Sequence, residues 1–191
     1  MELNVDESGR PWTLSGGGPV IVIPAEIAGH WRGTLPPVGV QVPAGWTWGG
    51  SSGPECDYDR ACSPGGYEPT PHGGFGWVSV QETPVLILDG EILTWFEAGA
   101  EGGSLVRSSI DEADGDPEKV SPGSWCSVGV DVISLTDGRL YMFDSAAAGA
   151  VDPAQIAADD GVGVITLGAG NWRVEFATDA DECDFVRFRR P

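Results

Sequence analysis

Basic residues are scarce in this sequence of 191 residues. Ten lysines and arginines stand against 29 aspartates and glutamates, Lys119 is the single lysine, and the formal net charge is −19. A field of that sign repels phosphate backbones and anionic lipid surfaces. We therefore expect neither a nucleic-acid nor a membrane partner, and we expect a basic protein partner. The alternatives are that the acidity serves solubility alone or that it reflects adaptation to salt, which the single lysine would suit.

The sequence also shows no recognisable targeting segment. Residues 1–7 contain no positively charged segment followed by an apolar one, so they do not resemble a secretory signal peptide. No apolar run approaches the length that spans a bilayer. The sequence predicts a cytoplasmic protein.

Common catalytic motifs are absent as well. The sequence has no G-x-S-x-G elbow, no P-loop and no dinucleotide fingerprint. Its two histidines, His30 and His72, have no neighbouring pattern of nucleophile and acid, so we expect neither to act as a catalytic base. The prediction is a protein without enzymatic activity or cofactor. A hydrolase that uses carboxylates alone is the alternative, because it needs no histidine.

The four cysteines do not form a recognisable metal or disulfide framework. Cys56 and Cys62 are separated by five residues, whereas zinc knuckles separate their cysteines by two. In a reducing cytosol, Cys56, Cys62, Cys126 and Cys183 are expected to be free thiols. The sequence predicts no metal site.

Short apolar runs separated by turn residues dominate the rest of the chain. This pattern predicts a mostly β protein, a single antiparallel, hairpin-rich domain over residues 1–191 with roughly eight to ten strands. A sandwich or a strongly curved sheet is the expected architecture, with one or two short helices. The continuously apolar residues 20–23 should be buried on both faces, and proline starts at Pro24 and Pro153 indicate the helices.

Three pairs of runs flank turn residues and predict β-hairpins. Asp89-Gly90 lies between residues 85–88 and 91–96, and Asp137-Gly138 lies between residues 128–135 and 139–143. The third pair, residues 162–167 and 171–176, flanks a glycine-rich turn at residues 168–170.

A long loop is expected at residues 33–54, where glycine and proline are frequent and none of the 22 residues is charged. Loops of this length in compact domains are functional or disordered, and disordered segments contain few aromatic residues. Trp46 and Trp48 therefore favour a functional loop in which both indoles point the same way and bind a partner. The alternative is that both fold back over the sheet and extend the core.

Two acidic segments complete the candidate contact surface. Asp57 and Asp59 lie in the Cys56–Cys62 segment, where a structural role comes first and a partner contact second. Residues 111–118 form an acidic loop that lacks the oxygen spacing of a calcium-binding EF-hand, so we expect a solvated turn or an electrostatic contact. The expected partner-binding residues are the two tryptophans and five aspartates: Trp46, Trp48, Asp57, Asp59, Asp111, Asp114 and Asp116.

Three segments together resemble the immunity protein 21 family of bacterial polymorphic toxin systems. The first runs from Gly16 to Pro24 and continues in His30-Trp31-Arg32-Gly33, and the second is Asp57-Tyr58-Asp59-Arg60-Ala61-Cys62. The third is the strand pair around residues 138–144.

The resemblance implies a mostly β immunity protein that binds and neutralises a cognate toxin in the cytoplasm and catalyses nothing itself. A basic nuclease toxin is our hypothesis for the partner, because an acidic inhibitor would associate quickly with it and block its phosphate-binding cleft. The rival interpretation is a β-rich protein-binding or scaffold module unrelated to toxins.

Overall fold

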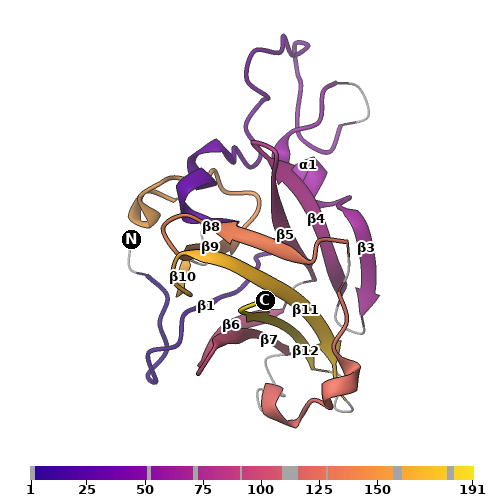
Figure 1. Ribbon diagram of the computed structural model, residues 1–191. Helices are drawn as coiled ribbons and strands as arrows, with labels where there is room; N and C mark the ends of the chain where they lie inside the picture. The colour runs from indigo at the N-terminus through magenta and orange to yellow at the C-terminus, as the bar shows by residue number, and fades with distance from the viewer. Residues whose placement is uncertain are drawn as a thin grey trace.

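The computed structural model describes residues 3–50, 53–70, 73–90, 92–108, 116–127, 129–156, 161–179 and 183–191. The chain is mostly β, as predicted, with two sheets and short helical segments (Figure 1). The described residues form twelve strands, more than the expected eight to ten. Within these ranges, no helix is both long enough and apolar enough to cross a membrane.

Two six-stranded sheets contain all the described strands, and every neighbouring pair is antiparallel. The first sheet has the order β1 (Trp12–Thr13), β6 (Leu93–Gly99), β7 (Gly102–Ser108), β12 (Asp184–Arg189), β11 (Gly170–Thr178), β8 (Val132–Leu135). The second sheet has the order β10 (Gly163–Thr166), β9 (Arg139–Asp144), β2 (Val20–Pro24), β5 (Thr83–Asp89), β4 (Gly73–Val80), β3 (Gly65–Thr70).

The main core lies between the two sheets and takes side chains from both. In β2, Val20 and Val22 face this core, whereas Ile21 and Ile23 belong to a second cluster. That second cluster also contains residues of η1 (Ala25–His30) and α1 (Asp57–Ala61), which cover the outer face of the second sheet. The prediction that residues 20–23 are buried on both faces is therefore confirmed.

A third cluster covers part of the outer face of the first sheet. It includes Trp95, Val106 and Phe185, and the half-buried Trp125 packs against it. The segment before Trp125 carries η2 (Pro117–Lys119) and η3 (Pro122–Ser124). The remaining helical segment, η4 (Pro153–Gln155), begins as expected after Asp152, whose side chain accepts a hydrogen bond from the Ala154 N–H.

The three predicted hairpins are wrong, because the strands of each pair lie in different sheets. β5 is in the second sheet and β6 in the first, β8 is in the first and β9 in the second, and β10 is in the second and β11 in the first. A turn that needs a positive φ can form a tight hairpin, or it can form a corner at which the chain passes from one sheet to the other. Apolar runs on both sides of the turn are compatible with either arrangement. At Gly138, φ is +80° and the backbone packs closely against that of Gly168, so two of these corners lie side by side.

One hairpin that the structure forms carries no such sequence signal. β4 and β5 pair through Val80 and Thr83, and the two turn residues, Gln81 and Glu82, have φ of 49° and 64°. These angles are those of a type I′ turn, which normally uses glycine or asparagine. Because neither turn residue is glycine or asparagine, the sequence carries no signal for this hairpin.

Candidate functional site: the projecting loop and its support

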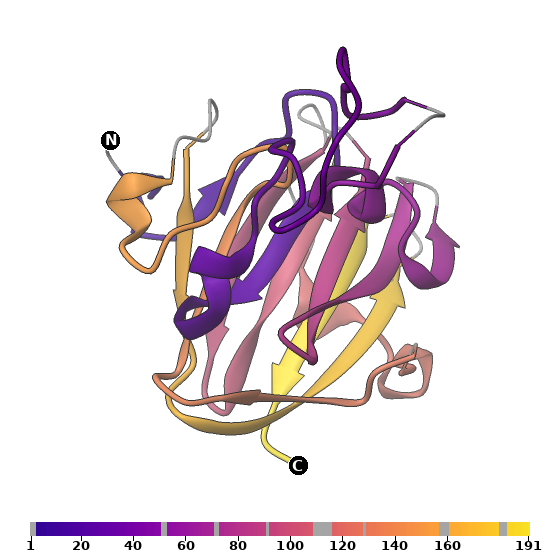
Figure 2. The same cartoon turned by 90° about the horizontal axis from the view of Figure 1, so that it is seen from above.

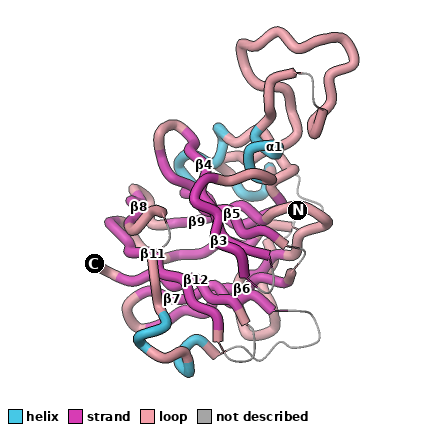
Figure 3. Tube along the Cα trace, turned by 90° about the vertical axis from the view of Figure 1, so that its right-hand side faces the viewer, coloured by secondary structure: helices cyan, strands magenta, loops and turns pink. Residues whose placement is uncertain are grey.

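The uncharged loop that begins at Gly33 projects away from the two sheets (Figure 3). Four of its apolar side chains are largely exposed: Leu35 at 46%, Val38 at 75%, Val40 at 48% and Trp48 at 52%. Isolated exposed apolar residues are ordinary on protein surfaces, but four on one projecting loop are typical of an interaction surface. We call Leu35, Val38, Val40 and Trp48 the loop surface.

The loop leaves the fold at a fixed point. Gly33 has φ of +56°, and a Cβ at this position would collide with the backbone of Ala146 and Ala147. The Thr34 N–H donates to the Ala146 carbonyl at 3.1 Å. The root of the loop is therefore held against the segment that follows β9.

Helix α1 supports the loop through Asp59. One carboxylate oxygen accepts hydrogen bonds from the backbone N–H of Cys56 at 3.0 Å and its thiol at 3.2 Å, and the other accepts from the Gly49 N–H at 2.6 Å. Burial acts to raise the pKa of Asp59, but the hydrogen bonds from Cys56 and Gly49 outweigh it and the pKa is lowered. Asp59 therefore joins the start of α1 to the far part of the loop.

Asp57 joins α1 to the root of the loop. Its carboxylate accepts from the Arg32 backbone N–H at 2.8 Å and pairs with the Arg60 guanidinium at 2.8 Å. Arg60 also donates to the Ser79 carbonyl on β4. These contacts give Asp57 and Asp59 the structural role that was expected from the sequence.

Two arrangements were predicted for the tryptophans of this loop: both indoles point the same way toward a partner, or both fold back over the sheet. Neither arrangement fits both side chains. Trp46 is half-buried and donates its indole N–H to the Pro54 carbonyl at 3.1 Å, so it closes the loop upon itself. Trp48 meets Tyr58 of α1 edge to face, with ring centroids 5.1 Å apart, and stays half-exposed. Neither residue belongs to the core clusters of the described residues, so they do not fold back over a sheet.

The structure brings together four of the seven predicted contact residues. Trp46, Trp48, Asp57 and Asp59 lie in or next to the projecting loop, whereas Asp116 lies with η2 at the opposite end of the molecule (Figure 1). Asp116 caps η2 by accepting from the Glu118 N–H at 3.0 Å. Asp111 and Asp114 lie outside the described residues, as does His72.

Replacement of Asp59 by alanine should release the loop from α1. We expect a loss of about 1 kcal/mol of stability from the helix cap, and faster hydrogen exchange at Gly49. Urea unfolding and amide exchange measure the two effects. Asp152→Ala removes a comparable cap at η4, where Asp152 accepts from Ala154 at 3.0 Å, and should leave Gly49 exchange unchanged. Equal protection of Gly49 in wild type and Asp59→Ala would contradict this role.

A cavity lies at the root of the loop. It has a volume of about 380 Å³ and is lined by His30, Arg32, Leu35, Val38 and Asp57 among others. Arg32 and the aliphatic residues are not among the contact residues predicted from the sequence. The sequence does distinguish Arg32, because it is the one arginine or lysine between Arg10 and Arg60.

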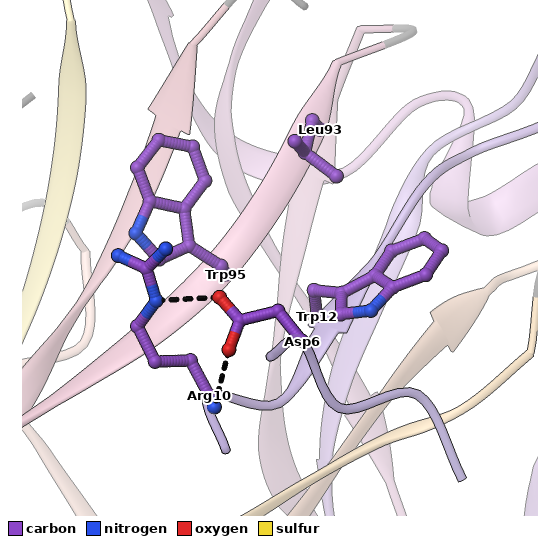
Figure 4. A pocket seen from close by; sticks show the side chains of 5 residues that line it. All are labelled: Asp6, Arg10, Trp12, Leu93 and Trp95. Atoms are coloured by element: carbon purple, nitrogen blue, oxygen red, sulfur yellow. Dashed lines mark hydrogen bonds and ion pairs between the residues drawn. The ribbon is translucent and has the colours of Figure 1, made fainter. Parts of the chain in front are cut away.

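A second cavity, of about 290 Å³, lies on the outer face of the first sheet (Figure 4). Trp12 and Trp95 are cross-strand partners of β1 and β6, and Leu93 lies on the same face. At its rim, Arg10 pairs with Asp6 at 2.6 Å and lies over the Trp95 ring, 5.8 Å from its centroid. Its walls are apolar and its two rim charges neutralise one another.

The chemistry of the α1 carboxylates does not favour acid–base catalysis by this pair. A general acid needs a raised pKa, and hydrogen bonding lowers that of Asp59. In the described part of the chain, no three His, Cys, Asp or Glu residues are arranged to hold a metal ion. None of the four cysteines, all of which lie within the described residues, forms a disulfide; Cys56 and Cys183 are buried, and Cys62 and Cys126 are exposed.

The fold and the loop together define an acidic β protein with two sheets. It presents an uncharged, partly apolar loop, which two carboxylates of helix α1 hold in place. No protein-family model, curated protein or solved structure matches this chain.

Proposed function

We propose that this protein binds and neutralises a toxin protein of a bacterial polymorphic toxin system in the cytoplasm of the producing cell. The observation that carries the proposal is the loop surface, which presents Leu35, Val38, Val40 and Trp48 to solvent. The sequence resemblance to immunity proteins supplies the class of partner.

Inhibition by occlusion requires a contact element that is already shaped for its target, because ordering a free loop on binding would cost affinity. The hydrogen bonds from Gly49 to Asp59 and from Trp46 to Pro54 provide that order here. The exposed indole of Trp48 is typical of a residue that contributes strongly to an interface, because tryptophan is enriched among the residues that dominate binding.

The net charge of −19 favours a basic toxin. Long-range attraction would speed association with such a partner, and salt would slow it by screening the field. A nuclease domain fits this charge, because it must itself attract phosphate backbones. The nuclease assignment is a narrower proposal than the immunity function.

Co-expression with the toxin encoded by the neighbouring gene tests the proposal. We expect rescued growth and recovery of a one-to-one complex. The variant Val38→Ser/Val40→Ser/Trp48→Ala should weaken binding on the order of 30-fold or more, since central interface residues contribute over 2 kcal/mol each. Val132→Ser, which changes an exposed valine of β8, is the matched control and should bind as wild type.

The outcomes separate the parts of the proposal. Absence of both rescue and complex would refute the immunity function. Rescue that persists in the triple variant would retain immunity and refute the loop surface. Recovery of a non-toxic partner in place of the toxin would favour the general binding module. An association rate that does not fall between 50 and about 500 mM salt would refute electrostatic capture.

A further inference from the structure

The cavity at the root of the loop is lined by Arg32, whose guanidinium forms no ion pair with the described residues. Arg32 uses its backbone N–H for Asp57 and its Nε for the Pro36 carbonyl, at 3.2 Å. In the part of the chain that the structure describes, no carboxylate lies within ion-pair distance of its guanidinium. Of the ten basic residues, Arg32, Arg173 and Arg190 have no ion pair within the described residues.

Most of the other basic residues are paired, which makes the contrast clear. Ion pairs occupy seven of them: Arg10, Arg60, Arg107, Lys119, Arg139, Arg187 and Arg189. Arg32 is half-buried and lines a cavity of about 380 Å³. Its hydrogen bonds within the described residues use the backbone N–H and Nε, which leaves the two Nη groups available for an anion that enters the cavity.

The acid in the same cavity does not neutralise Arg32. Both oxygens of Asp57 have partners, since one pairs with Arg60 and the other accepts the Arg32 backbone N–H. His30 and Gln81 line the cavity and add ring and amide donors. The polar side of this cavity therefore consists mainly of hydrogen-bond donors.

The cavity is also lined by aliphatic residues, Leu35, Pro37 and Val38, at the start of the projecting loop. A ligand that suits both kinds of lining residue has one anionic group joined to a short apolar group. The overall charge of −19 opposes ligands with several negative charges, because a single local arginine cannot offset the repulsion.

We propose that this cavity binds a monocarboxylate attached to a short aliphatic group, with Arg32 holding the carboxylate and the loop residues holding the apolar part. Two sources share this chemistry, a free aliphatic acid and the C-terminal residue of a peptide. The proposal does not depend on the toxin, because it rests on the cavity alone.

Titration of the full chain, followed by ¹H–¹⁵N NMR, tests the site. The probes are isovalerate, the tripeptide Gly-Gly-Leu with a free C-terminus, and its C-terminal amide. We expect saturable shifts around residues 29–38 and 81 with at least one carboxylate probe, and binding at least about tenfold weaker for the amide. Isovalerate binding identifies a free acid as sufficient, and binding of the free-acid tripeptide alone identifies a chain end.

Two variants provide the controls. Arg32→Gln should weaken binding of the carboxylate about tenfold or more. Arg190→Gln removes another arginine without an ion pair among the described residues, which lies 4.1 Å from the Trp172 ring centroid, and should bind as wild type. Acid and amide that bind alike, an unchanged affinity in Arg32→Gln, no saturable shift with any probe, or tighter binding of inorganic phosphate would each overturn the proposal. The acid and amide comparison needs no variant, so it decides the question even if Arg32→Gln folds poorly.

Discussion

Replacing Arg107 by methionine is expected to destabilise the protein by about 3–5 kcal/mol, because it leaves a buried carboxylate without its cation. Arg107 of β7 and Asp184 of β12 are 1% and 0% exposed, with 3.6 Å between the paired atoms. Burial lowers the pKa of Arg107 to about 10, while the charge of Asp184 opposes the shift, so the guanidinium is still protonated at neutral pH.

The buried pair also joins the two sheets, which makes its loss costly. Arg107 in the first sheet donates to the carbonyls of Gly74 and Asp89 in the second. Asp184 accepts hydrogen bonds from the hydroxyls of Thr70 in the second sheet and Thr178 in the first. Methionine can fill part of the volume but cannot satisfy these acceptors.

Urea unfolding of four proteins measures the effect: wild type, Arg107→Met, Asp184→Ala and the double variant. The double variant should lose less stability than the sum of the two single losses, because no unpaired charge remains buried. Arg139→Met is the control, since its pair with Asp137 is exposed and should contribute less than about 1 kcal/mol. Strict additivity, or a loss in Arg107→Met no larger than in the control, would contradict the assigned role.

Stability should fall steeply below pH 4.5 because of Glu175 on β11. Two arginines of β12, Arg187 and Arg189, bind its carboxylate at 2.7 Å each. The hydrogen bond from Arg189 lowers the pKa of Glu175 to about 2, with Arg187 adding to it against the effect of burial. A depressed carboxyl pKa stabilises the fold fully above the unfolded value of 4.5, and this contribution is lost as the pH falls toward 2.

The expected size of this contribution is about 2 kcal/mol, less than the full shift implies, because the arginines are 31% and 41% exposed and solvent screens them. Glu175→Gln should lose that amount at pH 7 and show a flatter stability profile between pH 4.5 and 2. Urea unfolding at a series of pH values measures both. A wild-type profile as flat as that of Glu175→Gln would show that the three side chains do not act together.

The sequence was sufficient to locate most strands but not to assign them to sheets. The continuously apolar residues 20–23 placed β2 correctly, with Val20 and Val22 in the main core and Ile21 and Ile23 in the cluster on the other face. Sheet assignment failed at Gly90 and Gly138, because a positive φ is needed equally by a hairpin and by a corner. Long-range packing decides between them, and no local pattern contains that information.

The candidate site was also predictable only in part, because a local sequence pattern does not show which distant residues meet in the fold. Trp48 and the two α1 carboxylates were recognisable as unusual residues in an uncharged loop and a short helix. The sequence marks Arg32 only as an isolated basic residue, and it does not show that, among the described residues, no carboxylate lies within ion-pair distance of the guanidinium. Only the folded arrangement shows which charges remain without a partner.

The position of β12 has a consequence for how the first sheet folds. This strand lies between β7 and β11 and is the last strand along the described chain. Before residues 184–189 are in place, β1, β6 and β7 can pair on one side and β11 and β8 on the other, but no strand of this sheet joins the two groups. A folding intermediate that lacks β12 therefore exposes two unpaired strand edges, which a chaperone that shields such edges would bind.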